Sequence, residues 1–250
     1  MNILITNDDG WGTPGIVTLT RLMAALEKDA HVYVVAPDGP RSAFSSKVSL
    51  GATLYLNKVD TKALELPDNV EVWTTDGTPC DCVKLAINVV LKDQPIDLIV
   101  SGINHGSNSS INIVYSGTMG AALIGAENGI PAIGYSIDEH AMDVDLSHFA
   151  AIIPDITRHL LDEKMPCGVC YNVNAPVGPI QGLRWTRQAD GFWQKEYEPT
   201  TDAEGRTCYR MVGEYVNREP DAADTDMWAV AHGFVSIQPV SVDMTAYSEL

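Results

Sequence analysis

Short apolar runs alternate with helical patterns through the first half of the chain, and this alternation constrains the fold more than any other feature. Asn2–Thr6 and His31–Ala36 predict buried strands, while Gly15–Lys28 carries apolar residues at the spacing of one helix face. Strands separated by helices pair side by side in a parallel sheet. We therefore predict an α/β fold with a mostly parallel sheet as its core and helices on both faces.

The same patterns continue beyond residue 60. Thr78-Pro79-Cys80-Asp81 predicts a helix start, because Thr caps a helix, Pro suits its first turn and Asp follows three residues after the cap. That helix is expected to run to about Leu91. Further strands are predicted at Val70–Thr74, Ile96–Ser101, Ala132–Ser136 and Val235–Val240, and further helices at Thr118–Glu127 and Phe149–Leu161, the last kinked or restarted at Pro154.

After about residue 175 the pattern changes to aromatic residues among Thr, Gly and charged residues, which is typical of long β-hairpins. These aromatics are Trp185, Phe192, Trp193, Tyr197 and Tyr209. Exposed aromatics on a hairpin arm favour contact with another subunit. We predict one domain over residues 1–250, with a core over about 1–175, an arm over about 176–234 and a returning C-terminal segment over about 235–250.

Charge and hydropathy exclude several classes of protein. The 250 residues hold 16 Lys and Arg against 33 Asp and Glu, a net charge of −17. Nucleic-acid polymers and anionic membrane surfaces are therefore unsuitable partners. No apolar run approaches the ~20 residues of a membrane span, and the first ten residues lack the basic start of a signal peptide. We expect a cytoplasmic protein whose five cysteines are reduced thiols.

Four polar stretches follow predicted strands, at residues 7–10, 38–46, 101–104 and 115–118. Ligands bind at the carboxyl ends of strands in open α/β sheets. In the first stretch, Asp8 and Asp9 are adjacent carboxylates that repel each other unless a cation lies between them. Mg²⁺ and Mn²⁺ are the natural candidates, because they prefer oxygen ligands. An Asp-Gly turn with solvated side chains is the alternative.

The other stretches add candidates for the same chemistry. Ser116, Gly117 and Thr118 open a predicted helix, where free N–H groups and the helix dipole suit a phosphate; a plain N-cap is the alternative. Asn104 could bind a metal or a phosphate, or stabilise its own turn. Its neighbour His105 is expected to be an exposed loop residue.

Residues 10–15 also match the G-x-G-x-x-G pattern of dinucleotide-binding proteins, with Asp38 near the position of a ribose-binding acid. Two features disfavour NAD there. The carboxylates of Asp8 and Asp9 lie beside the place where a pyrophosphate would bind, and Pro14 removes a backbone N–H from the loop.

Four blocks taken together resemble the SurE family of survival-protein 5′/3′-nucleotidases. They are NILITNDDG with a following PGI, VVAPDGPRSAFSS, IVSGINHGSN and YSGTMGAAL, and their order and approximate spacing agree with the family. The closing segment GFVSIQPVSVDMT is also similar, so the resemblance covers nearly the whole chain. It implies a Rossmann-like core, an extended hairpin arm, and swapped C-terminal elements that build homodimers or homotetramers.

The resemblance also implies an activity and a site. The activity is hydrolysis of nucleoside 5′- and 3′-monophosphates by a metal-activated water, with one divalent ion per subunit. The implied metal ligands are Asp8, Asp9, Ser42 and Asn104, the two aspartates also being the catalytic carboxylates, and the implied phosphate contacts are Asn108, Ser116, Gly117 and Thr118. The family often has glycine after the ligand serine, where this chain has Ala43.

Two other functions stay open at the level of sequence. One is a phosphatase that acts mainly on polyphosphate or another small phosphomonoester. The other is a nucleotide- or NAD-binding module without catalysis. Aromatic residues beside the phosphate site would favour nucleotides, and Phe44 and Tyr115 are the candidates.

Overall fold

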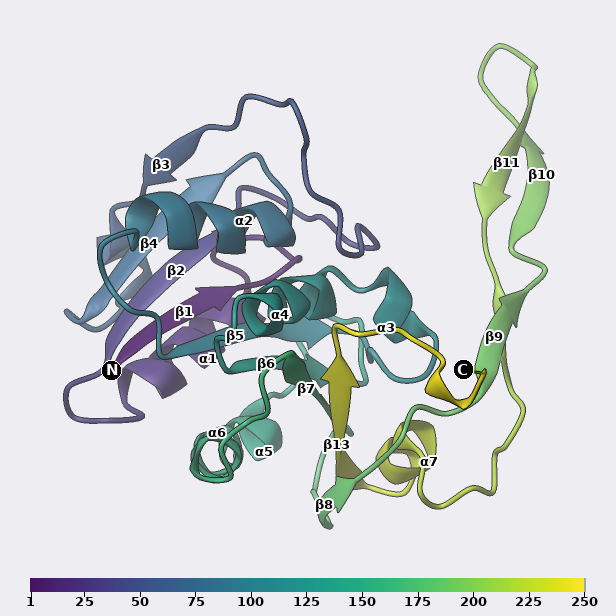
Figure 1. Ribbon diagram of the computed structural model, residues 1–250. Coiled ribbons are helices and arrows are strands. Elements are labelled where there is room, and N and C mark those ends of the chain that lie inside the picture. Colours follow the sequence, from purple (N-terminus) through teal and green to yellow (C-terminus); the bar gives the residue numbers. More distant parts are fainter. Residues whose placement is uncertain (250) are drawn as a thin grey trace.

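The computed structural model describes residues 1–249, except the side chains of residues 62 and 63, and shows one central sheet (Figure 1). The strands lie in the order β3-β4-β2-β1-β5-β6-β7-β13-β8. Their bounds are β1 Asn2–Thr6, β2 His31–Pro37, β3 Leu56–Lys58, β4 Val70–Thr75, β5 Leu98–His105, β6 Ala132–Ile137, β7 Val169–Ala175, β8 Gly182–Trp185 and β13 Phe234–Ser241.

Six of these strands run parallel, in the order β4-β2-β1-β5-β6-β7. The chain adds β2 and β4 on one side of β1 and then adds β5, β6 and β7 on the other. The order therefore reverses between β1 and β5, which pair with Ile3 opposite Leu98. A ligand-binding crevice is expected at such a reversal. The prediction of a Rossmann-like, mostly parallel core is confirmed.

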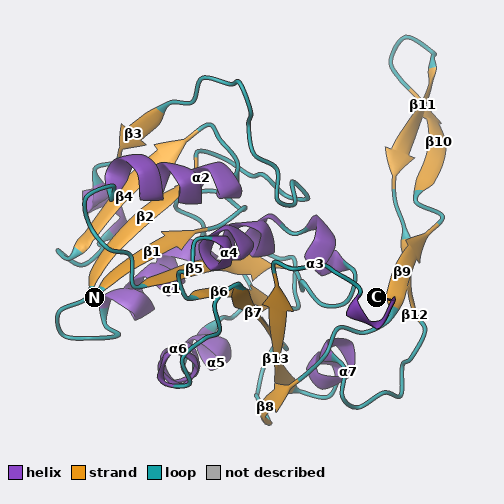
Figure 2. Ribbon diagram, viewed as in Figure 1, coloured by secondary structure: helices purple, strands orange, loops and turns teal. Residues whose placement is uncertain are grey.

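Helices cover both faces of the sheet (Figure 2). They are α1 Pro14–Ala24, α2 Pro79–Leu85, α3 Asn112–Tyr115, α4 Gly117–Glu127, α5 Ser147–Ala150, α6 Ile153–Asp162 and α7 Asp226–Ala231. A π-helical turn at Ala86–Val90 continues α2, and 3₁₀ turns lie at Thr61–Leu64 and Tyr247–Glu249. Ile3 and Ile5 of β1 point into the apolar cluster under α1, α5 and α6. Leu4 points into the cluster under α2 and α4, because side chains alternate along a strand.

The predicted elements are present, with shifted ends. The helix start at Thr78 is confirmed, since Thr78 and Asp81 form the reciprocal hydrogen bonds of a capping box. Strand β5 continues beyond the predicted Ser101 to His105, across an irregularity in its pairing with β6. β3, β7, α3 and α7 have no counterpart among the predicted elements. In β7 the polar Asn172 and Asn174 interrupt the apolar pattern, although both are buried.

Small residues let α4 lie close to the sheet. A Cβ atom on Gly134 of β6 would lie 2.4 Å from Met119 Sδ, and one on Gly125 would lie 2.9 Å from Ala132 Cβ. Nine of the 11 residues of α4 are buried. The position of this helix is therefore set by close packing, and its first residues lie at the carboxyl end of β1.

The predicted hairpin arm is present at the C-terminal side. Strand β9 (Gly191–Gln194) pairs with β12 (Glu214–Asn217), and β10 (Tyr197–Thr201) pairs with β11 (Thr207–Met211), all antiparallel. Figure 1 shows β10 and β11 projecting away from the sheet. No helix within residues 1–249 combines the length and the apolar character needed to cross a bilayer.

The close packing of α4 gives a first prediction. Gly134→Ala should lower the free energy of unfolding by about 1–3 kcal/mol, because the new methyl group overlaps Met119. Met119→Ala should cost about 2–5 kcal/mol by leaving a cavity. In urea denaturation, the double variant should lose less than the sum of the two, since the smaller side chain makes room for the methyl group. Additive losses would contradict this account.

Candidate active site

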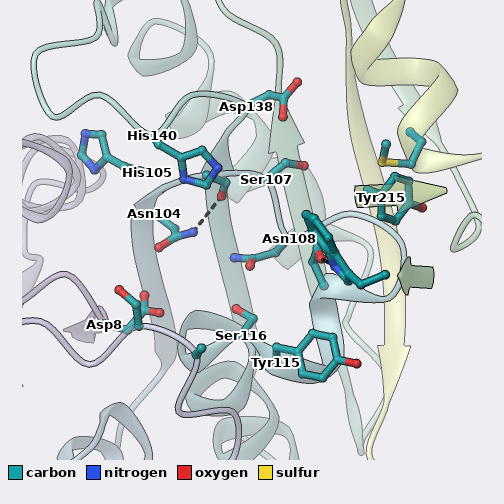
Figure 3. A pocket seen from close by; sticks show the side chains of 16 residues that line it. Asp8, Asn104, His105, Ser107, Asn108, Tyr115, Ser116, Asp138, His140 and Tyr215 are labelled. Carbon is teal, nitrogen blue, oxygen red and sulfur yellow. Dashed lines mark hydrogen bonds between the residues drawn. The ribbon is translucent and has the colours of Figure 1, made fainter. Parts of the chain in front are cut away.

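A cavity of about 440 Å³ lies at the carboxyl ends of β1, β5 and β6 (Figure 3). Five of the eight predicted site residues line it: Asp8, Ser42, Asn104, Asn108 and Ser116. The other three, Asp9, Gly117 and Thr118, are buried next to these residues in the chain. Segments from four separate stretches of the sequence therefore meet at one place.

Asp8 is held by the start of α4. Its Oδ1 accepts a hydrogen bond of 2.6 Å from Thr118 Oγ1. A Cβ atom on Gly117 would lie 2.9 Å from Asp8 Cβ, so glycine is needed there for the helix to approach the carboxyl group. Burial raises the pKa of Asp8 to about 6, opposed by the hydrogen bond from Thr118 and reinforced by the negative charge of Asp9.

Asp9 is held by His105, contrary to the expectation that this histidine is an exposed loop residue. The backbone N–H of His105 donates to Asp9 Oδ2 at 3.3 Å, and Nδ1 of the ring lies 3.1 Å from the same oxygen. The His105 side chain is fully buried, because β5 continues through it and pairs it with Ile137 of β6. Its Nε2 atom has no hydrogen-bond partner among the residues that the structure describes.

Asn104 and the loop after β2 complete the oxygen atoms on this side of the cavity. Asn104 Nδ2 donates to the Gly106 carbonyl at 2.7 Å (Figure 3). This hydrogen bond uses the amide nitrogen and leaves Oδ1 as the atom that can bind a cation. The loop that carries Ser42 is tied to β1 by the N–H of Arg41, which donates to the Asp8 carbonyl at 2.6 Å. Ala43 has φ +59°, a left-handed conformation that glycine adopts without steric cost.

These residues fit a hard divalent cation. Two carboxylates, an amide and a hydroxyl provide oxygen donors, which is the chemistry that Mg²⁺ and Mn²⁺ prefer. A nearby cation would also favour the ionised form of buried Asp8. In residues 1–249 no three His, Cys, Asp or Glu side chains gather at one place suited to a metal ion. A cation here would therefore depend on Ser42 and Asn104 as well as on the two carboxylates.

The residues predicted to contact the phosphate differ in which of their hydrogen-bonding atoms remain available to a ligand. Ser116 Oγ accepts the N–H of Met119 at 3.0 Å as the cap of α4, which leaves its hydroxyl hydrogen available. Asn108 Nδ2 donates to Ser136 Oγ at 2.8 Å, and its backbone N–H donates to Asn174 Oδ1 at 2.8 Å. Thr118 is fully buried and its hydroxyl is engaged by Asp8, so its backbone is the part left for a ligand.

Gly10, the first glycine of the G-x-G-x-x-G pattern, is required by the packing of the loops around it. Asn7 Nδ2 donates to the Gly10 carbonyl, and the Gly10 N–H donates back to Asn7 Oδ1. A Cβ atom on Gly10 would lie 3.0 Å from the Gly39 carbonyl carbon. Gly10 thus closes the turn that carries the two aspartates and lets the loop after β2 approach it.

Several residues that line the cavity have no counterpart in the sequence prediction. Asp138 and His140 follow β6, and Trp193 and Tyr215 come from the arm. Of the two aromatics proposed from sequence, Tyr115 lines the cavity. Phe44 is exposed, with Lys47 Nζ 4.9 Å from the centre of its ring, and is not part of the wall. No local pattern distinguishes Trp193 or Tyr215 from the other arm aromatics.

The raised pKa of Asp8 gives a second prediction. A rise from 3.8 in the unfolded chain to about 6 in the fold means that the metal-free protein loses about 2 kcal/mol of unfolding free energy as the pH rises from 4 to 7. Asp8→Asn removes this loss, because the amide does not ionise. Urea denaturation in EDTA should therefore show the variant gaining stability over the wild type across that pH range.

Asp93→Asn, at an exposed carboxyl group, is the matched control and should follow the wild type. Parallel pH profiles for the wild type and Asp8→Asn would contradict the burial of a carboxyl group at this position.

Comparison with known proteins agrees with this geometry. The family model described as Survival protein SurE matches residues 3–195. The chain is similar to the 5′-nucleotidase SurE of Flavobacterium psychrophilum, with 41% identity covering 98% of this chain and 93% of that protein. It is also similar to the 5′-nucleotidase SurE of Christiangramia forsetii, with 42% identity covering 98% and 92%.

Among solved structures, the crystal structure of the SurE protein from Aquifex aeolicus superimposes with a TM-score of 0.82 at 33% identity. The match covers 100% of this chain and 97% of that one. Family model, full-length relatives and fold agree, and the chain belongs to the SurE family.

Proposed function

We propose that this protein hydrolyses nucleoside 5′- and 3′-monophosphates to nucleoside and phosphate in the presence of a divalent cation. The observation that carries the proposal is the meeting of Asp8 with the first turn of α4 beside a cavity at the strand-order reversal. This proximity supports the proposal, because oxygen atoms of the kind that bind a cation lie next to helix N–H groups that suit a phosphate. Relatives named 5′-nucleotidase SurE, at about 40% identity, support hydrolysis of the 5′-monophosphates.

Asp8, Asp9, Ser42 and Asn104 would hold one Mg²⁺ or Mn²⁺ per subunit. When bound, such an ion supplies Lewis acidity and a coordinated water of lowered pKa. Thr118 and His105 act through the carboxylates, which they keep in place by hydrogen bonds. Asp8 and Asp9 are the groups available to accept a proton from the water.

The phosphate group would lie between the cation ligands and the start of α4. Ser116 and Asn108 line the cavity there, and the backbone of Gly117 and Thr118 provides the positive end of the helix. Donors fixed by their own hydrogen bonds need no reorganisation when negative charge builds on the phosphate oxygens. Asn108 is held in this way by Ser136 and Asn174.

The arm is the part of the chain that we assign to assembly. Tyr197, Tyr209 and Met211 on β10 and β11 are each more than 60% exposed, which favours burial against a second copy of the chain. We propose a homodimer or homotetramer built through residues 176–234, with residues 1–175 as the catalytic core and 235–250 as the returning segment. The five free thiols suit the reducing cytoplasm.

The proposed activity gives a third prediction. Protein stripped with EDTA should release no phosphate from AMP, and added Mg²⁺ or Mn²⁺ should restore release. A panel of 5′- and 3′-mononucleotides, short polyphosphate and glycerol phosphate ranks the substrates. Polyphosphate or glycerol phosphate as the best substrate would overturn the nucleotide assignment. No release with either ion from folded protein would overturn the phosphatase assignment itself.

The approach of α4 to Asp8 gives a fourth prediction. Gly117→Ala should lower kcat for AMP about 100-fold, because the methyl group moves the Asp8 carboxyl group from its position. Gly39→Ala is the matched control, since a Cβ atom there meets no atom closer than 3.7 Å. Wild-type activity in Gly117→Ala would show that the exact place of the Asp8 carboxyl group is unimportant.

A further inference from the structure

The base of the arm forms one wall of the cavity that contains Asp8. Trp193 of β9 and Tyr215 of β12 line this cavity together with Tyr115, the last residue of α3. Figure 3 shows Asp8 on one side and Tyr115 and Tyr215 on the other, with Asn108 between them. At about 440 Å³ the cavity lies within the range of ~300–1,000 Å³ that is usual for small-molecule sites. It therefore has room for more than a phosphate group.

The two arm aromatics are fixed in place. Tyr215 lies directly opposite Trp193 in the β9–β12 pair, and the rings meet edge to face with centroids 5.5 Å apart. Trp193 Nε1 donates to Asn112 Oδ1 at 2.8 Å, and the Tyr215 hydroxyl donates to Ser110 Oγ at 2.5 Å. Both polar atoms of the pair are thus hydrogen-bonded to the core, which holds the two rings in position.

Gly191 of β9 and Gly213, which directly precedes β12, make room for these rings. A Cβ atom on Gly213 would lie 2.9 Å from the Trp193 ring, and one on Gly191 would lie 1.9 Å from the Tyr215 hydroxyl oxygen. The base of the arm is therefore shaped around the two side chains. Because the indole N–H and the phenol hydroxyl are occupied, what Trp193 and Tyr215 offer to the cavity is aromatic surface without free hydrogen-bond donors.

Aromatic surface of this kind binds nucleobases by stacking, which every base supports because each has a π face. We infer that Trp193, held by Tyr215, is the residue on which the base of the substrate stacks, and that it determines the preference for nucleotides over smaller phosphomonoesters. This inference rests on the proposed function. The phosphate end is held near Asp8 and Ser116, and the base end is held by the arm.

The test compares AMP with ribose 5-phosphate, which lacks the base, using the full-length protein with Mg²⁺. The wild type should have the higher kcat/KM for AMP. In Trp193→Ala the ratio of the two kcat/KM values should fall about tenfold, through a higher KM for AMP; tenfold corresponds to ~1.4 kcal/mol. Trp193→Phe keeps an aromatic face and should recover most of the ratio.

Phe192→Ala is the matched control. Phe192 is the neighbouring aromatic on β9, it stacks with Arg218, and it does not line the cavity. Its ratio should equal that of the wild type. An unchanged ratio in folded Trp193→Ala, or a wild type without preference for AMP, overturns the inference while phosphatase activity stands. Absence of phosphate release from both substrates in the wild type overturns the proposed function, and the inference with it.

A binding measurement keeps the test decisive if Trp193→Ala does not fold. With Mg²⁺ present, a non-hydrolysable phosphonate analogue of AMP should quench the tryptophan fluorescence of the wild type, and ribose 5-phosphate should not. Trp193→Phe retains four of the five tryptophans and should lose the quenching by the AMP analogue. Equal quenching in the wild type and in Trp193→Phe places the base elsewhere and overturns the inference.

Discussion

The contact between the Asp8 carboxyl group and the first turn of α4 is the interaction on which the rest of the site depends. It needs a helix that starts at the carboxyl end of β1, a hydroxyl at residue 118 and no side chain at residue 117. The helix can reach this place because small residues along α4 and Gly134 of β6 let it lie close to the sheet. Packing far from the cavity thus sets the position of a carboxylate inside it.

When no cation is bound, the buried carboxylate of Asp8 lowers the stability of the fold. Burial raises the pKa of Asp8 to about 6, and Asp9 lies beside it with His105 as its partner. A bound cation reverses the balance, because it favours the ionised form that burial disfavours. The −17 net charge of the chain fits the same logic, since a protein so acidic needs a cation to attract a phosphate.

Buried amides link the phosphate side of the cavity to the far strands of the sheet. Asn172 of β7 donates to the Asn108 carbonyl, and Asn174 accepts the Asn108 N–H. These asparagines interrupt the apolar pattern of β7, which is why that strand is not predicted. A polar residue inside an apolar strand is stable when its hydrogen bonds are satisfied, as they are here. The two asparagines that prevent β7 from being predicted are therefore the residues that hold Asn108 in place.

Much of this protein is determined by its sequence alone. Apolar runs alternating with helical patterns specify a parallel α/β sheet, and the capping residues at Thr78 and the restart at Pro154 fix helix starts. The polar residues at the carboxyl ends of β1 and β5 can be predicted as a site because parallel strands bring these ends to one edge of the sheet. Local rules suffice for these features, since each depends on residues close together in the chain.

The tertiary structure alone decided the rest. The Thr118 hydroxyl bonds to Asp8 across 110 residues, the His105 ring is buried against Asp9 across 96, and the indole of Trp193 bonds to Asn112 across 81. A serine or threonine at a helix start, a histidine after a strand and a tryptophan in a hairpin have many possible partners. Which partner each one meets depends on how the sheet, α4 and the arm pack together, and that packing is a property of the whole chain.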